Sequence, residues 1–201
     1  MKILSAIICL SLIAPEIKLD GIIDASEWKD AKTAALKGGG KLYYQQEGTV
    51  LYVAVKGIAK GWSHVYVAHN DTVIVMHASA ALGTVNYLPQ NGKWNTNQQF
   101  NWQLRDRVYN PATEQKLNDH FNQHGWAANN LNIGDGMTAE FKIDLSRFAG
   151  QKLAFAALFA ADAANPHYFP DKLNDQALAR DLVYGNPPAQ LEFNIANWQK
   201  L

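Results

Sequence analysis

The stretch that decides the fold lies near the start of the chain, at residues 17–28, and reads IKLDGIIDASEW. Within it, Asp20-Gly21 favours a turn, because glycine accepts a positive φ at little cost. Residues 48–57 read GTVLYVAVKG and favour a β-strand through their valine, leucine and tyrosine content. The two stretches together predict a turn beside the first hairpin of a β domain, with Trp28 as a structural side chain that packs on this hairpin.

Short apolar segments, separated by glycine, asparagine, aspartate and proline, continue along the rest of the chain. They predict strands at 41–46, 50–56, 64–69, 72–78, 84–88, 98–104, 138–144, 152–160 and 190–194. Asn70-Asp71 forms a two-residue turn between two of them. This pattern is typical of a mainly all-β fold, an antiparallel two-sheet β-sandwich. One or two helical insertions are expected, at 111–124 and at 175–182.

One predicted strand also indicates its own surroundings, because residues 153–160 read LAFAALFA and are apolar at every position. Both faces of such a strand should be covered by other parts of the protein. Leu153, Phe155 and Phe159 share a face, which is expected to point into the sandwich core. The opposite face is mostly alanine, and the helix at 111–124 is its expected cover.

Residues 17–28 and 48–57 together resemble the opening of family 9 carbohydrate-binding modules and their DOMON-like relatives, which are β-sandwich domains of secreted proteins. The resemblance covers about the first sixty residues and is architectural beyond them. It implies non-catalytic binding of a small ligand, most simply a carbohydrate. After Lys56 the chain departs from the family, because GWSH at 61–64 replaces the usual acidic run before the next strand. This departure counts against the family's sugar site, and against the calcium that often accompanies it, in this chain.

Length and composition limit the other possibilities. The 201 residues, 48% of them hydrophobic, suffice for one domain with a full core. Lys and Arg number 18, as do Asp and Glu, and no basic run stands out, so neither nucleic acid nor a membrane is an expected partner. Residues 1–14 resemble a secretory signal peptide, with a strand of a cytoplasmic protein as the alternative. We therefore expect a signal peptide at 1–14 and one sandwich domain at 15–201, secreted or periplasmic.

Tryptophan and histidine side chains supply the candidate binding site. Aromatic faces pack on the C–H faces of sugars, and polar side chains bind the hydroxyl groups. The expected pocket lies between the loops around 62–64, around Trp94 and around Trp126. The candidate ligand-binding residues are Trp62, His64, His77, Trp94, Trp102, Arg105 and Trp126, with Asn95 and Asn129 as further polar groups. The alternative is that at least two of these tryptophans are core residues and that His77 is a hydrogen-bonded histidine at the edge of the core.

Metal binding, haem binding and catalysis are the other possible classes of function. Some DOMON-like domains hold haem between methionine and histidine, but Met76 and His77 are adjacent in a strand and point to opposite faces. His120 and His124 lie four residues apart on the predicted helix, a spacing that lets two imidazoles reach one metal ion. Glu140 and Asp144 are expected to face solvent, and no convincing catalytic set is present. A non-enzymatic protein without a cofactor is expected, with haem and calcium as alternatives.

Overall fold

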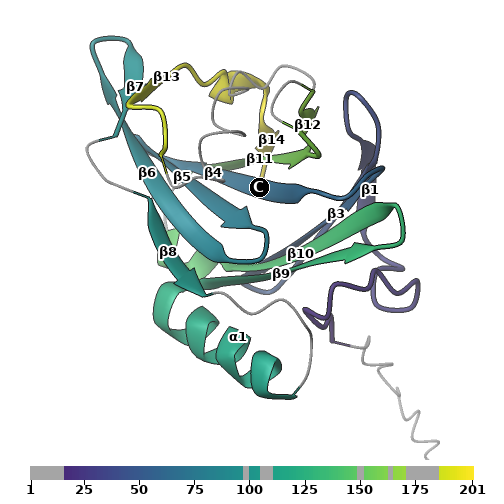
Figure 1. Ribbon diagram of the computed structural model, residues 1–201. Helices are drawn as coiled ribbons and strands as arrows, with labels where there is room; N and C mark the ends of the chain where they lie inside the picture. The colour runs from purple at the N-terminus through teal and green to yellow at the C-terminus, as the bar shows by residue number, and fades with distance from the viewer. Residues whose placement is uncertain (1–15, 97–99, 105–110, 149–151, 163–164, 171–185) are drawn as a thin grey trace, which may run out of the picture.

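The computed structural model describes residues 16–96, 100–104, 111–148, 152–162, 165–170 and 186–201. Within these ranges the chain forms two antiparallel sheets and one α-helix, as Figure 1 shows. The expected mainly all-β, two-sheet sandwich with a helical insertion is therefore confirmed. Among the residues described, no helix combines the length and the apolar character required to cross a membrane. The segment expected to be a signal peptide and the second expected helix, at 175–182, lie outside the described residues.

The smaller sheet has five strands. Their order is β1 (Lys32–Ala35), β2 (Lys41–Glu47), β3 (Val50–Gly57), β10 (Gly136–Asp144) and β9 (Trp126–Ile133). β2 and β3 form the hairpin predicted from the sequence, and Gly48 in its turn has a positive φ of 56°. β9 was not predicted, because its sequence WAANNLNI is rich in residues that disfavour strands. It pairs with β10 along its whole length, so the sheet overrides the local preference.

The larger sheet has nine strands. Along its main path the order is β12 (His167–Phe169), β11 (Leu153–Ala160), β4 (Trp62–His69), β5 (Thr72–Ala78), β6 (Leu82–Gln90), β7 (Lys93–Asn95) and β13 (Gln190–Leu191). β14 (Gln199–Lys200) pairs with β11, and β8 (Asn101–Leu104) pairs with β6. The remaining elements are helix α1 (Pro111–His124) and the 3-10 helices η1 (Leu145–Phe148) and η2 (Ile195–Asn197).

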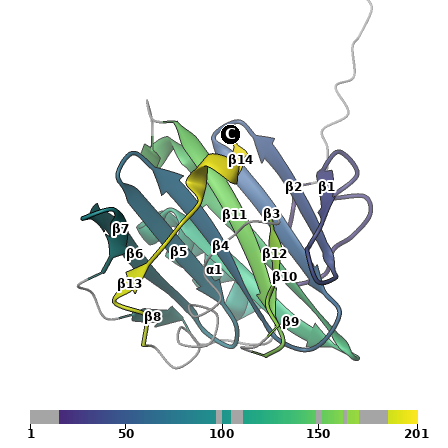
Figure 2. The ribbon, with the colours of Figure 1, turned by 90° about the horizontal axis from the view of Figure 1, so that it is seen from above.

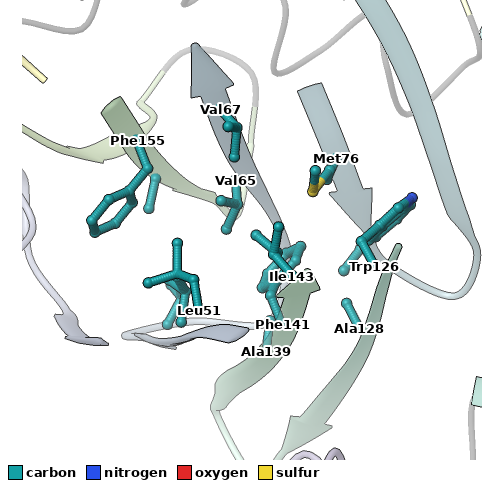
Figure 3. Close-up of a cluster of buried hydrophobic side chains, with 14 of the residues drawn as sticks. Leu51, Val65, Val67, Met76, Trp126, Ala128, Ala139, Phe141, Ile143 and Phe155 are labelled. Carbon is teal, nitrogen blue, oxygen red and sulfur yellow. The ribbon is translucent and has the colours of Figure 1, made fainter. Parts of the chain in front are cut away.

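The main hydrophobic core lies between the inner faces of the two sheets. Figure 3 shows Leu51 and Phe141 from the five-stranded sheet meeting Val65 and Phe155 from the nine-stranded sheet. Each of these side chains is fully buried, as alternation along the strands requires. The core therefore fixes which residues of each strand point outward, on the two faces away from the partner sheet.

The outer face of the nine-stranded sheet is covered by the C-terminal segment. In Figure 2 this segment, in yellow, crosses over the strands between β14 and β13. The alanine face of β11 packs with Leu191 and Trp198 of the segment in a second hydrophobic cluster. The expectation that both faces of β11 are covered is thus confirmed, but helix α1 is not the cover. Helix α1 packs beside β9 and β10 instead, with Leu117 in the main core.

The outer face of the five-stranded sheet is covered by the N-terminal stretch at residues 17–28. Trp28 is 4% exposed and meets Tyr43 of β2 edge-on, with ring centroids 6.2 Å apart, which confirms its structural assignment. Beneath it lies Glu140 of β10, which is completely buried. The sequence-based expectation that Glu140 faces solvent is wrong, because the polar face of β10 lies under this segment.

Candidate functional site

Two histidines stand opposite each other on the outer face of the nine-stranded sheet. His64 of β4 and His77 of β5 are direct cross-strand partners, and their ring centroids are 4.9 Å apart. The pairing follows from the tight turn between these strands, where Asn70 has a positive φ of 45°. Two residues predicted separately as ligand contacts are therefore brought together, and we call them the imidazole pair.

Aromatic rings enclose His77 on the side away from His64. Trp102 of β8 and Phe100 meet its ring edge-on, with centroid distances of 5.4 and 5.9 Å. Gly83 of β6 lies between His77 and Trp102 in the pairing and makes this approach possible. A Cβ atom on Gly83 would stand 2.4 Å from Cε1 of Phe100. The glycine therefore leaves the space that the Phe100 ring occupies.

The imidazole pair is fully buried and only partly hydrogen-bonded. Nδ1 of His64 and the hydroxyl group of Tyr66 are hydrogen-bonded at 3.0 Å. Within the described part of the chain, Nε2 of His64 and both ring nitrogens of His77 have no hydrogen-bond partner. Each such buried polar atom costs about 1–3 kcal/mol of folding free energy. The pair thus presents three buried ring nitrogens that have no partner among the described residues.

Burial also sets the charge of the pair. It lowers the pKa of His77 to about 3. It lowers the pKa of His64 well below the ordinary histidine value, with a further contribution from neighbouring His77. Both rings are therefore neutral near pH 7, and a neutral imidazole offers one N–H donor and one acceptor nitrogen.

Trp62 and Trp94, which the sequence also predicts as ligand contacts, pack against different parts of the outer cluster. Trp62 lies on β4, two residues from His64 on the same face, and is half-buried at the edge of the outer cluster. Trp94 lies on β7 and packs on Phe193, with ring centroids 5.9 Å apart. It pairs with Pro89, far along β6 from Gly83, so it lies away from the imidazole pair.

Trp126 lies in strand β9 rather than in a loop, and it is 3% exposed within the main core. Figure 3 shows it beside Met76 in the space between the sheets. It therefore cannot take part in a site on the outer face, and the expected pocket between the 62–64, Trp94 and Trp126 loops is not formed. Arg105 lies outside the described residues.

The remaining polar candidates have structural partners. Asn129 is buried on β9 and donates its Nδ2 to the carbonyl of Leu19 at 2.9 Å. Nδ2 of Asn95 donates to the carbonyls of Gln90 and Lys93, each at 3.2 Å. Both side chains thus hold loops or the N-terminal segment in place.

The two helical histidines, His120 and His124, stack with ring centroids 4.5 Å apart. Burial lowers the pKa of His120 to about 4, with a smaller effect of His124. His120 also meets the core residue Trp126 edge-on at 5.2 Å, which accounts for its burial by packing. Among the residues described, no cluster of three or more His, Cys, Asp or Glu side chains is arranged to hold a metal ion.

Comparison with known proteins adds no functional assignment, since no family model, curated protein or solved structure matches this chain. The function is therefore inferred from the geometry of the site. The fold brings Trp62, His64, His77 and Trp102 onto the outer face of the nine-stranded sheet. Sequence reasoning missed Tyr66 and Phe100, although the period of two along β4 already places Tyr66 on the face of His64.

Proposed function

We propose that this protein is a non-catalytic binding domain whose ligand is a carbohydrate, bound on the outer face of the nine-stranded sheet. The observation that carries the proposal is the imidazole pair, completely buried with three ring nitrogens that lack a partner among the described residues. A sugar hydroxyl group both donates and accepts hydrogen bonds, so it complements a neutral imidazole in either orientation. Binding would thus satisfy ring nitrogens that have no partner among the described residues.

The half-buried indoles on either side of the pair support the same ligand class. Trp62 and Trp102 both pack against the outer cluster and remain partly exposed. Such rings offer flat apolar surfaces for the C–H faces of a pyranose. Since His64 and His77 are fully covered, a sugar would reach them only when a covering ring, such as Phe100 or Trp102, moves aside.

The resemblance of the N-terminal stretch to family 9 carbohydrate-binding modules and DOMON-like domains is consistent with this proposal. In such a protein, residues 1–14 would direct export, and the domain would act in the periplasm or outside the cell. The chain would bind its ligand without chemical turnover, and no cofactor is needed for that role.

A second candidate is a metal-binding or haem-binding redox domain, and one observation favours it. Two neutral imidazoles 4.9 Å apart, with Nε2 of His64 free of hydrogen bonds among the described residues, resemble an incomplete set of metal ligands. The hydroxyl group of Tyr66 on Nδ1 would orient the ring, as outer partners of metal-bound histidines do. Met76 points into the core, opposite to His77, so it would not act with His77 on one haem.

Glycan-array screening of the folded protein, followed by calorimetric titration of the strongest hit, tests the first candidate. We expect Trp62→Ala to weaken binding by about tenfold, which corresponds to about 1.4 kcal/mol. Trp94→Ala is the matched control, because this indole is also half-buried but lies away from the imidazole pair. Equal losses in the two variants would contradict the proposed location. Tight binding of Zn²⁺ or haem without any glycan binding would favour the second candidate.

A further inference from the structure

A separate cavity lies at one end of the five-stranded sheet, and its volume is about 290 Å³. Three segments meet around it: the turn at Gly21-Ile22-Ile23, the end of β3 at Lys56-Gly57, and the tip of the β9–β10 hairpin. Figure 1 shows the N-terminal segment, in purple, near this hairpin. The size is at the lower end of the range for small-molecule pockets. It is therefore large enough for a small ligand.

The walls of this cavity are largely apolar. Ile22, Ile23, Ile133 and Met137 belong to its lining, together with Gly21, Gly57 and Gly136, and the Met137 side chain also packs in the main core. Ile22 and Ile133 are each 53% exposed, and Ile58, which follows the cavity residue Gly57, is 62% exposed. Three of the five large apolar side chains that are exposed in the described residues thus lie at or next to this cavity. Covering them with a ligand would remove apolar surface from water, which is favourable.

One charged residue, Lys56, belongs to the described lining of the cavity, and alternation along β3 places it on the outer face. It forms no ion pair with any described residue. Thr138, which also lines the cavity, donates its hydroxyl group to the carbonyl of Gly21. The nearby Asp20 carboxylate is bonded to the N–H of Ile22, so the side of the cavity next to Lys56 is the one that suits an anionic group.

The cavity is held open by hydrogen bonds of the turn that forms one wall. The N–H of Gly21 donates to Oε2 of buried Glu140 at 2.8 Å, and the N–H of Ile22 donates to Oδ1 of Asp20 at 2.8 Å. The bonds with Glu140 and Thr138 fix the wall to β10, and the bond with Asp20 stabilises the turn itself. A preformed site binds more tightly, because less conformational entropy is lost on binding.

We propose that this cavity binds a small amphipathic carboxylate, with its apolar body between Ile22 and Ile133 and its anionic group beside Lys56. The inference goes beyond the proposed carbohydrate function and is independent of it. The cavity lies on the five-stranded sheet, whereas the imidazole pair lies on the outer face of the other sheet. Either site can fail its test without affecting the other.

Octanoate is the probe, with 1-octanol as the uncharged molecule of equal chain length. In ¹H–¹⁵N spectra of the full chain, octanoate should shift the amide resonances of Gly57, Gly136 and Thr138. Lys56→Gln should weaken octanoate binding about fivefold, the effect of losing one exposed ion pair of about 1 kcal/mol. It should leave octanol binding unchanged. Lys32→Gln, at an exposed lysine on β1, is the matched control and should bind octanoate as the wild type does.

A second pair of variants tests the apolar wall. Ile133→Asn should also weaken octanoate binding, and Leu88→Asn should not, although the two side chains are almost equally exposed at 53% and 54%. Both positions are on the surface, so both variants should fold. The proposal is overturned if millimolar octanoate leaves the three amide resonances in place. It is equally overturned if Lys56→Gln and Ile133→Asn both bind octanoate with the wild-type affinity.

Discussion

The buried carboxyl group of Glu140 should make the protein less stable as the pH rises from about 6.5 to about 8. Glu140 accepts hydrogen bonds from the N–H of Gly21 at 2.8 Å and from Nε1 of Trp28 at 3.0 Å. Burial nevertheless dominates and raises the pKa of Glu140 from its ordinary value of 4.5 to about 8. Between these two values the folded protein retains a proton that the unfolded chain has released. The contribution of Glu140 to the free energy of unfolding therefore decreases with increasing pH in this range.

The expected contribution of Glu140 is at most about 1.4 kcal/mol per pH unit and about 1.6 kcal/mol between pH 6.5 and pH 8, because the folded carboxyl group is half ionised at pH 8. The pKa values of the buried histidines His64, His77 and His120 are all lowered, so these rings are neutral in the folded protein, whereas in the unfolded chain they still bind protons between pH 6.5 and about pH 7.5. In the lower half of this window they therefore increase the stability with pH and partly offset the effect of Glu140. The contribution of Glu140 is obtained as the difference in the free energy of unfolding between the wild type and Glu140→Gln.

Urea unfolding followed by tryptophan fluorescence, at several pH values in this window, measures the effect. In Glu140→Gln the side chain stays neutral, so the decrease that Glu140 causes should disappear and the increase caused by the histidines should remain, whatever the change in absolute stability. Glu192→Gln, at an exposed position, should retain the wild-type dependence. A Glu140→Gln variant with the wild-type dependence on pH would refute the reasoning, because the difference in stability between the two proteins would then not change with pH.

Two further predictions concern the imidazole pair. Since burial lowers the pKa of His77 to about 3, the stability that this ring supports is present above about pH 6.5 and is lost as the pH falls. His77→Gln should therefore reduce the loss of stability between pH 6.5 and pH 5 by about 2 kcal/mol, as measured by urea unfolding at both values. Gly83→Ala should destabilise the fold by about 1–3 kcal/mol, because the added Cβ would meet the Phe100 ring at 2.4 Å and the Asn101 carbonyl at 2.6 Å. Thermal unfolding compares it with Gly136→Ala, where φ lies outside the left-handed region and the nearest neighbour of the added Cβ is the Gly57 carbonyl at 3.2 Å, and an equal cost in both would contradict the packing argument.

The strands that the sequence could predict are those whose local preference agrees with their place in the sheet. β3 and β5 consist largely of β-branched and aromatic residues, and the turns beside them contain Gly48 or Asn70-Asp71. β9 lacks such residues and is held by pairing with β10, which no local pattern reports. For the same reason Trp126 was placed in a loop, although the sheet carries it into the core.

The candidate site was predictable in part. Strand alternation placed His77 with Val73 and Val75, away from Met76, and the structure confirms this face. The two-residue turn also implied that His64 stands opposite His77, because such a turn fixes the register of a hairpin. What could not be predicted is the cover, since Phe100 and Trp102 reach His77 only through the pairing of β8 with β6. Burial of Glu140 escaped prediction in the same way, as it depends on where Trp28 packs.

The segments that cover the outer faces of the two sheets bury both an acidic group and two basic groups. The N-terminal segment buries Glu140, whose pKa is raised, and the outer face of the other sheet buries His64 and His77, whose pKa values are lowered. Below about pH 6.5, protonation of the histidines in the unfolded chain outweighs the opposite effect of the single carboxyl group. Above that pH the unfolded chain gradually releases its histidine protons, so the effect of Glu140 becomes the larger one and the stability decreases. Together, these buried groups should therefore place the maximum of the free energy of unfolding near pH 6.5, where Glu140, His64 and His77 are all neutral in the folded protein.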